Sequence, residues 1–264
     1  MRKIILDNLL NTRDLGGLKT KHGYKIKKKR IIRSGRLFES SKNDIKTLKN
    51  KYNLNTIIDL RTLDEINEKP DPTIDGVTYN HIPIFENGLQ GISKEKSDET
   101  SHIINLIKAM SNAKEKMIDL YPAMVSEKYA QNSFNSIFKI LIYNTEGSTL
   151  YHCSAGKDRV GILTYLILST LGVSYEDILE DYLLTNKYYY ELMNEMMEIA
   201  RNYNIPEDIV LQIPYTQGVI EEYLENAVKY INKHYGSTYN YISNAIGIND
   251  EDIIKLRSNY LEKS

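Results

Sequence analysis

The chain has one cysteine, no tryptophan and six prolines among its 264 residues. A single cysteine excludes a disulfide within the chain, so the thiol is free and a reducing compartment, the cytoplasm, is its natural setting. The net charge of −1 gives no electrostatic reason to expect nucleic acid as a partner. The longest apolar run, residues 160–173, is too short and too polar to span a membrane. The first residues are too poor in apolar side chains for a signal-peptide core, although export without such a signal stays open.

The single cysteine stands in a loop between an expected strand and an expected helix. Residues 148–151 have the pattern of a short strand, and residues 160–171 form an apolar run typical of a helix that Gly172 ends. Such a loop directs its backbone N–H groups and the positive end of the helix dipole to one place, which makes an anion site. In that field, beside lysine and arginine, Cys153 is expected to be a nucleophilic thiolate. Arg159 can bind two phosphoryl oxygens with its planar guanidinium.

We therefore expect residues 152–161 to bind and attack a phosphoryl group. Cys153 is the candidate nucleophile, Arg159 the candidate stabiliser of the transition state, and Asp158 the nearest carboxylate that could protonate the leaving group. The other candidate substrate-binding residues of the loop are Ser154, Ala155, Gly156, Lys157, Val160 and Gly161. A buried structural cysteine is the alternative, but Ala-Gly-Lys-Asp-Arg is a poor core sequence.

The loop sequence His-Cys-Ser-Ala-Gly-Lys-Asp-Arg-Val-Gly closely resembles the phosphate loop of the bacterial tyrosine-phosphatase-like family. Other segments resemble that family's signatures in the same order: Asn11-Thr-Arg-Asp-Leu-Gly-Gly, Ile32-Arg-Ser-Gly, Ile58-Asp-Leu-Arg with Glu65, His81-Ile-Pro-Ile, Tyr235-Gly-Ser and Leu256-Arg. The resemblance implies a dual- or triple-specificity phosphatase that acts on phosphoproteins and phosphoinositides. It also assigns the general-acid role to Asp158 and places the Asn11 segment beside the phosphate loop. One departure is Val160, where the family usually has a hydroxyl residue.

Strands and helices alternate early in the chain, and the second half is mainly helical. This order predicts an α/β fold with a central, mainly parallel sheet and helices on both faces. The expected strands include residues 55–60 and 77–84, and the basic run 24–33 is expected to be an edge strand or hairpin. Expected helices are residues 44–52, residues 134–143, a capped helix after Ser174, and most of residues 206–264 with a break at Gly236. Residues 86–131 are expected to form an inserted helical lid within one phosphatase domain, residues 1–264, that is a monomer.

Some residues keep two interpretations. Asp59 and Arg61 follow a buried strand at the sheet edge where ligands bind, so they are candidate substrate-binding residues. Asp59 could equally orient a neighbour or cap an element, and Arg61 could form an exposed salt bridge with Glu65. His81 is expected in the core rather than at a ligand.

Other basic residues are ambiguous in the same way. Arg13 and Asp14, beside two glycines, are expected to stabilise a turn. The basic residues 25–30 either block unwanted strand pairing or receive an anionic head group, the role also considered for Lys157.

Three functional alternatives stay open. A sulfurtransferase or arsenate reductase could use a similar loop, but neither needs the Lys-Asp pair, and such reductases usually need a second cysteine. A histidine-dependent acid phosphatase is disfavoured because the chain has no fitting Arg-His motif. A binding-only pseudophosphatase is the alternative that Val160 favours. No metal and no other cofactor is expected, because the sequence has neither an H-E-x-x-H motif nor a cysteine cluster.

Overall fold

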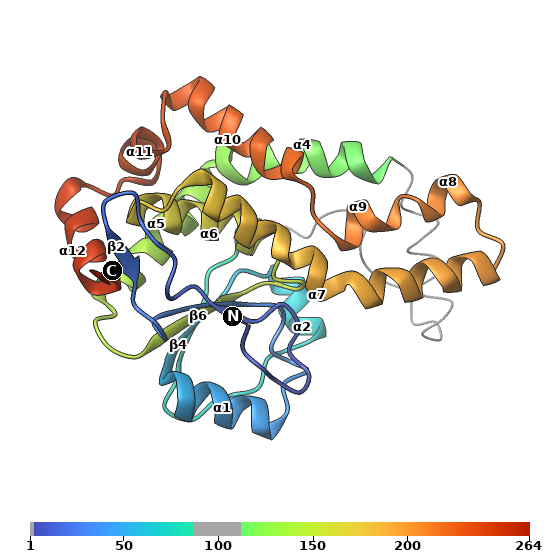
Figure 1. Ribbon diagram of the computed structural model, residues 1–264, viewed down its shortest axis with the longest axis horizontal. Coiled ribbons are helices and arrows are strands. Elements are labelled where there is room, and N and C mark those ends of the chain that lie inside the picture. The colour runs from blue at the N-terminus through green and yellow to red at the C-terminus, as the bar shows by residue number, and fades with distance from the viewer. Residues whose placement is uncertain (1–2, 87–111) are drawn as a thin grey trace.

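Five strands form the central sheet of the computed structural model, which describes residues 3–86 and 112–264 (Figure 1). Across the sheet the order is β1 (Arg13–Asp14), β3 (Ile31–Ser34), β6 (Ser148–His152), β4 (Leu54–Asp59) and β5 (Thr78–His81). The last four are parallel, and only β1 runs antiparallel to its neighbour. The predicted mainly parallel sheet is confirmed. Since parallel strands end at the same edge, Ser34, Asp59 and His152 are brought into register there.

Neighbouring residues along each inner strand point to opposite faces of the sheet, because side chains alternate along a strand. One face contributes Ile31, Ile58 and Tyr151 to a large hydrophobic cluster, while the adjacent residues Ile32, Ile57 and Leu150 belong to a smaller cluster on the other face. Helix α1 (Lys42–Tyr52) covers the smaller cluster through Leu48. Helices α5 (Lys128–Tyr143) and α6 (Asp158–Leu171) cover the larger one, so both faces carry helices as predicted (Figure 1).

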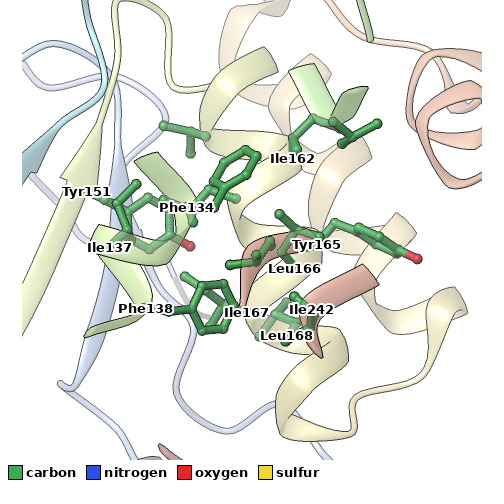
Figure 2. Close-up of a cluster of buried hydrophobic side chains, with 14 of the residues drawn as sticks. Phe134, Ile137, Phe138, Tyr151, Ile162, Tyr165, Leu166, Ile167, Leu168 and Ile242 are labelled. Atoms are coloured by element: carbon green, nitrogen blue, oxygen red, sulfur yellow. The ribbon is translucent and has the colours of Figure 1, made fainter. Parts of the chain in front are cut away.

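Helix α6 is the centre of the larger core. Twelve of its 14 residues are buried, because α5 shares its hydrophobic cluster and helices of the C-terminal half contact it. Figure 2 shows Phe134, Ile137 and Phe138 of α5 packed beside α6 and Ile242. A helix that is apolar on nearly every side is fixed by its neighbours. Its N-terminus, which carries the end of the predicted phosphate loop, is therefore held in place.

Local capping signals define several helix ends where the sequence predicts them. Ser41 and Asp44 form a capping box at the start of α1. Helix α6 ends at Gly172, whose φ of 89° is left-handed, and Ser174 caps the start of α7 (Tyr175–Asn202). Helix α10 (Glu221–Tyr235) ends before Gly236.

The C-terminal part is helical, as expected, with one exception. Its remaining elements are α8 (Glu207–Val210), α9 (Ile213–Gln217), α11 (Thr238–Asn240), the π-helix η1 (Tyr241–Ile246) and α12 (Asp250–Tyr260). The exception is strand β7 (Leu261–Lys263), which pairs antiparallel with β2 (Tyr24–Ile26) in a separate two-stranded sheet.

In the N-terminal half, the short helix α2 (Leu63–Glu68) follows β4.

The edge strand or hairpin expected over residues 24–33 is confirmed only in its first part, which is an edge strand. Its first part is β2 in the small sheet, and its last part is β3, an inner strand buried along its whole length. Lys27 Nζ donates to the carbonyls of Ser258 and Asn259 at 2.9 and 3.1 Å, in the last turn of α12. Arg30 donates to the carbonyl of Asn144, the residue that ends α5, at 2.8 Å. Cations satisfy exposed carbonyls at helix C-termini, so these two residues have structural roles.

The expected lid, residues 86–131, lies largely outside the described residues. Its described part comprises Glu86, α4 (Ala113–Ser126) and the start of α5. Helix α4 runs beside α10 above α6 (Figure 1). Within the described ranges, no helix combines the length and the apolar character needed to cross a membrane.

Candidate active site

The predicted loop leaves the C-terminal end of β6 and enters α6 after five residues, 153–157. Cys153 is 2% exposed and Arg159 9% exposed, so both side chains lie beneath the surface. Gly156 has φ of 66°, and a Cβ there would lie 2.3 Å from the carbonyl oxygen of Ser34. Only glycine tolerates both that conformation and that approach. The loop is therefore packed directly on the end of β3.

The outer side of the loop is held through its carbonyl groups. Asn11 Nδ2 donates to the carbonyls of Ala155 and Gly156 at 3.2 and 2.8 Å. Arg33 donates to the same Gly156 carbonyl at 2.8 Å, and the Tyr189 hydroxyl donates to that of Ala155 at 2.8 Å. The expectation that the Asn11 segment lies beside the loop is confirmed. Carbonyls bound on the outside leave the loop's N–H groups to line its inside, as an anion site requires.

Two buried arginines support this arrangement through one carboxylate of α7. Arg13 Nε and Arg33 Nη1 contact the two oxygens of Asp181 at 3.0 and 2.8 Å, and all three side chains are fully buried. Burial and the nearby Arg13 lower the pKa of Arg33. Both residues of the expected turn-stabilising pair also bond to nearby backbone: Asp14 accepts from the N–H of Gly16 at 2.8 Å, and Arg13 donates to the carbonyl of Asn11 at 3.2 Å.

Arg159 is oriented by Glu65 of α2. Its two terminal nitrogens contact the Glu65 carboxylate at 2.6 and 2.9 Å, and Ser154 Oγ donates to the same carboxylate. Burial would raise the pKa of Glu65, but the hydrogen bond and charge of Arg159, with Ser154, lower it to about 2. Burial would likewise lower the pKa of Arg159, but the Cys153 sulfur and then Glu65 raise it above its usual range. The nucleophile and the arginine are thus electrostatically coupled.

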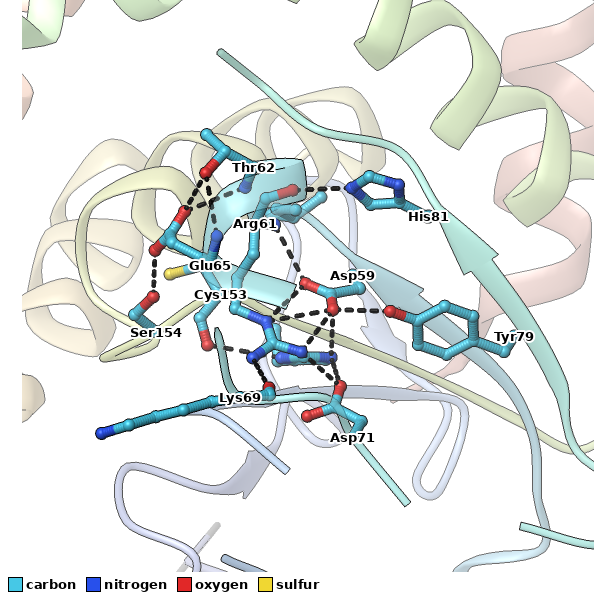
Figure 3. A network of polar contacts seen from close by, with 12 residues as sticks. Asp59, Arg61, Thr62, Glu65, Lys69, Asp71, Tyr79, His81, Cys153 and Ser154 are labelled. Atoms are coloured by element: carbon cyan, nitrogen blue, oxygen red, sulfur yellow. Dashed lines mark hydrogen bonds and ion pairs between the residues drawn. The ribbon is translucent and has the colours of Figure 1, made fainter. Parts of the chain in front are cut away.

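The expected exposed salt bridge between Arg61 and Glu65 is wrong. Arg61 is 1% exposed and contacts Asp59 at 2.7 Å and Asp71 at 3.0 Å (Figure 3). It precedes Thr62, the N-cap of α2, so it does not share a helix face with Glu65. Glu65 instead forms a capping box with Thr62 and turns toward the loop (Figure 3). The spacing of Thr62 and Glu65 is typical of a capping box, so the sequence did contain a signal for this position of Glu65.

Asp59 and Arg61 belong to a polar network beneath the loop. Burial would raise the pKa of Asp59, but His152 and Arg61 lower it. His152, the residue before the nucleophile, contacts Asp71 at 2.9 Å. The polar atoms of Asp59 and Arg61 are bonded within the protein, which favours an orienting role, while their predicted substrate contacts stay a prediction. His81 is exposed, contrary to its expected core position, and its Nε2 lies 2.8 Å from the Arg61 carbonyl oxygen.

The same network has the composition of a metal site. Asp59, Asp71 and His152 bring ligand atoms within 4.8 Å of one another. The guanidinium of Arg61, however, contacts both carboxylates at 2.7 and 3.0 Å. The protein therefore already supplies a cation at this position.

Asp158 and Lys157 are held by groups from the helical half of the chain. The Tyr121 hydroxyl of α4 donates to Asp158 Oδ1 at 2.7 Å, a contact that no local sequence signal predicts. Lys157 Nζ donates to the carbonyls of Thr216 and Gly218 and lies 3.8 Å from Asp158 Oδ2. Lys157 is therefore engaged with the C-terminal end of α9 and with Gly218, the residue that follows it.

The fold and the loop define a phosphoric monoester hydrolase. The chain belongs to the Tyrosine phosphatase family, whose model matches residues 4–262. It is 26% identical over 262 residues to the "Putative tyrosine-protein phosphatase H16_A0669" of Cupriavidus necator, covering 98% of this chain and 88% of the relative. It is 29% identical over 154 residues to a tyrosine-protein phosphatase of Nostoc commune, and the match covers 58% of this chain and 46% of the relative. The triple specificity protein phosphatase PtpB of Mycobacterium tuberculosis is 26% identical over 258 residues, covering 86% and 91%.

Proposed function

We propose that the protein hydrolyses phosphate monoesters through a phosphocysteine intermediate. The observation that carries this proposal is that Cys153 and Arg159 share one buried loop at the N-terminus of α6, with Arg159 oriented by Glu65. A helix N-terminus favours an anion, and a bidentate guanidinium matches the oxygens of a phosphoryl group.

In the first step the Cys153 thiolate attacks phosphorus, the S–P bond forms and the P–O bond to the leaving group breaks. The Asp158 carboxyl gives its proton to the departing oxygen. Arg159 and the loop N–H groups of residues 154–160 stabilise the charge on the phosphoryl oxygens, while the N–H of Gly161 donates to the Lys157 carbonyl at 2.8 Å. In the second step water attacks phosphorus, Asp158 takes the water proton, and the S–P bond breaks to release inorganic phosphate and the thiolate.

The substrate class we propose is phosphotyrosine, with phosphoserine, phosphothreonine and phosphoinositides as additional substrates. The name of the M. tuberculosis relative supports a broad specificity. For Lys157 to receive a second phosphate or a head group, its ammonium would have to leave the carbonyls of Thr216 and Gly218. We also propose that the protein is a monomer and that it acts in the cytoplasm, a reducing compartment that its one free thiol favours.

Hydrolysis of p-nitrophenyl phosphate in the presence of a chelator tests the mechanism. Wild type should release p-nitrophenol, and Cys153→Ser should lose turnover while still binding vanadate. Wild type that binds vanadate without turnover would instead identify a pseudophosphatase. Loss of wild-type activity with the chelator would show that the cysteine mechanism is incomplete.

A comparison of substrates tests the specificity. Lys157→Ala should reduce activity on phosphoinositide vesicles more than on a phosphotyrosine peptide if Lys157 receives a head group, and added salt should weaken the former more. Equal losses on both substrates would assign Lys157 to holding Thr216 and Gly218.

A further inference from the structure

Three buried tyrosines from three helices pack together beside Asp158, and one of them, Tyr121, contacts it directly. Tyr121 of α4 and Tyr223 of α10 are 0% exposed, and Tyr182 of α7 is 1% exposed. The ring of Tyr121 packs against those of Tyr182 and Tyr223, with centroids 6.4 and 5.3 Å away. The side chain of Asp158 is 20% exposed, so one side of its carboxyl meets the tyrosines while the group stays accessible.

The hydroxyl groups form a directed chain. Tyr121 donates its proton to Asp158 Oδ1 at 2.7 Å, and the Tyr182 hydroxyl lies 2.5 Å from that of Tyr121. A phenol has one proton, so Tyr182 must be the donor in the second contact. Burial, followed by the charge of Asp158, raises the pKa of both tyrosines well above the usual value. Both hydroxyl groups therefore keep their protons at neutral pH.

The loop itself makes room for this chain. Residue 161 is glycine, and a Cβ there would lie 2.8 Å from Cε2 and 3.0 Å from Cδ2 of Tyr182. Any larger side chain at residue 161 would push the Tyr182 ring outward. Gly161 thus lets Tyr182 approach, a role that the sequence did not indicate.

We propose that Tyr121, supported by Tyr182, is a positioning residue that fixes which oxygen of Asp158 carries the transferable proton. Because Tyr121 donates to Oδ1, a proton on Asp158 must reside on Oδ2. Oδ2 is the oxygen nearer Lys157 Nζ, at 3.8 Å. The helical half of the chain thereby completes the acid of the reaction, an inference that rests on the proposed general-acid role of Asp158.

Leaving-group dependence tests this proposal. Phenolate is a much poorer leaving group than p-nitrophenolate, so phenyl phosphate depends more on a well-placed acid. Tyr121→Phe should lower kcat/KM for phenyl phosphate about ten-fold more than for p-nitrophenyl phosphate, a fraction of the full effect of a general acid. Tyr182→Phe should act in the same direction with a smaller effect. Unchanged vanadate affinity in both variants would show that the phosphate loop is intact.

A double mutant separates positioning from structure. In an Asp158→Asn background there is no proton to position, so adding Tyr121→Phe should leave the ratio of the two substrates unchanged. Tyr241→Phe is the matched control, because it removes a buried hydroxyl that donates to the Val125 carbonyl on α4 at 2.8 Å. The control should retain the wild-type ratio.

Equal losses on both substrates in Tyr121→Phe, or a ratio change that persists in the Asp158→Asn background, would overturn the proposal. If Asp158→Asn changes the ratio and Tyr121→Phe does not, the tyrosine role alone is rejected. If Asp158→Asn leaves the ratio unchanged, the general-acid assignment has failed, and the positioning role fails with it.

Discussion

Glu65 and Arg159 face each other as a bidentate pair, with nitrogen-to-oxygen distances of 2.6 and 2.9 Å, although 94 positions separate them in the chain. The pair joins α2 to the phosphate loop. An arginine held in this way presents its remaining N–H groups to a ligand at little further cost in side-chain entropy.

Replacing Glu65 should therefore weaken phosphate binding more than it changes the fold. In Glu65→Gln the charge is lost and Arg159 is free to rotate, so we expect vanadate affinity to fall about ten-fold, as for the loss of about 1.5 kcal/mol from a charged hydrogen bond. Isothermal titration with vanadate measures this. Glu68→Gln, on an exposed residue of the same helix, is the control. Equal affinities in Glu65→Gln and wild type would contradict the orienting role.

The same pair should make stability depend on pH in acid. The pKa of Glu65 is lowered from 4.5 to about 2 in the folded protein, so the folded state binds its proton less readily than the unfolded state. The contribution of Glu65 to stability is then complete above its unfolded value and disappears as the pH falls from there toward about 2. Urea unfolding of wild type and Glu65→Gln should differ at about pH 6 and converge as the pH approaches about 2. A difference that stays constant over this range would refute the pairing.

Asp181 should be among the residues whose loss is most damaging. In Asp181→Asn the buried Arg13 and Arg33 would lose the carboxylate that both contact, and breaking a buried pair costs about 3–5 kcal/mol. Urea unfolding measures the loss. Glu39→Gln breaks the exposed Arg36–Glu39 pair, whose side chains are 43% and 40% exposed, and should cost less than about 1 kcal/mol. Similar costs for the two variants would show that the contacts of Asp181 with Arg13 and Arg33 are not important for stability.

Gly156 should not tolerate a side chain. Gly156→Ala would force a Cβ to within 2.3 Å of the Ser34 carbonyl oxygen at a left-handed φ of 66°, so the loop must move and vanadate binding should be lost. Gly23→Ala separates strain from collision, since Gly23 has φ of 78° with nothing within 4 Å of its Cβ position. That variant should lose about 1 kcal/mol of stability and keep its vanadate affinity. Retained vanadate binding in Gly156→Ala would show that the loop can accommodate a Cβ at this position and would contradict the prediction.

Features with local causes could be predicted from the sequence. The apolar run before Gly172 and the capping residues Ser41 and Ser174 specify helix ends within a few residues of themselves, and these ends are where they were expected. Strand β7 was missed because Leu-Glu-Lys directly follows α12 and has no strand pattern of its own; it exists through its pairing with β2.

Partners distant in sequence could not be predicted. Glu65 was paired with Arg61 because they stand four apart, yet Thr62 starts the helix between them and tertiary packing gives each another partner. Tyr182 lies on α7, and no motif in the sequence links it to Asp158. The bond from its hydroxyl toward Asp158 through Tyr121 depends on how the helices meet.

Val160 gives the last prediction. The bacterial tyrosine-phosphatase-like family usually has a hydroxyl residue at this position, where it would supply a hydrogen bond to the cysteine sulfur as it leaves phosphocysteine. Val160 is fully buried and cannot donate, and Ser154, the one hydroxyl residue among residues 152–161, donates to Glu65 instead. A hydrogen bond to a charged group contributes about 1.5–3 kcal/mol, a roughly ten- to hundred-fold effect on one step.

Breakdown of the intermediate should therefore limit turnover. We expect a pre-steady-state burst of p-nitrophenol followed by a slow steady state, and a faster steady state for Val160→Thr, whose side chain has nearly the same shape. Val160→Ala is the control, because it changes the packing without supplying a hydroxyl and should not accelerate turnover. Rapid-quench kinetics compare the single-turnover and steady-state rates. A linear time course together with an unimproved threonine variant would mean that another donor already stabilises the departing Cys153 thiolate.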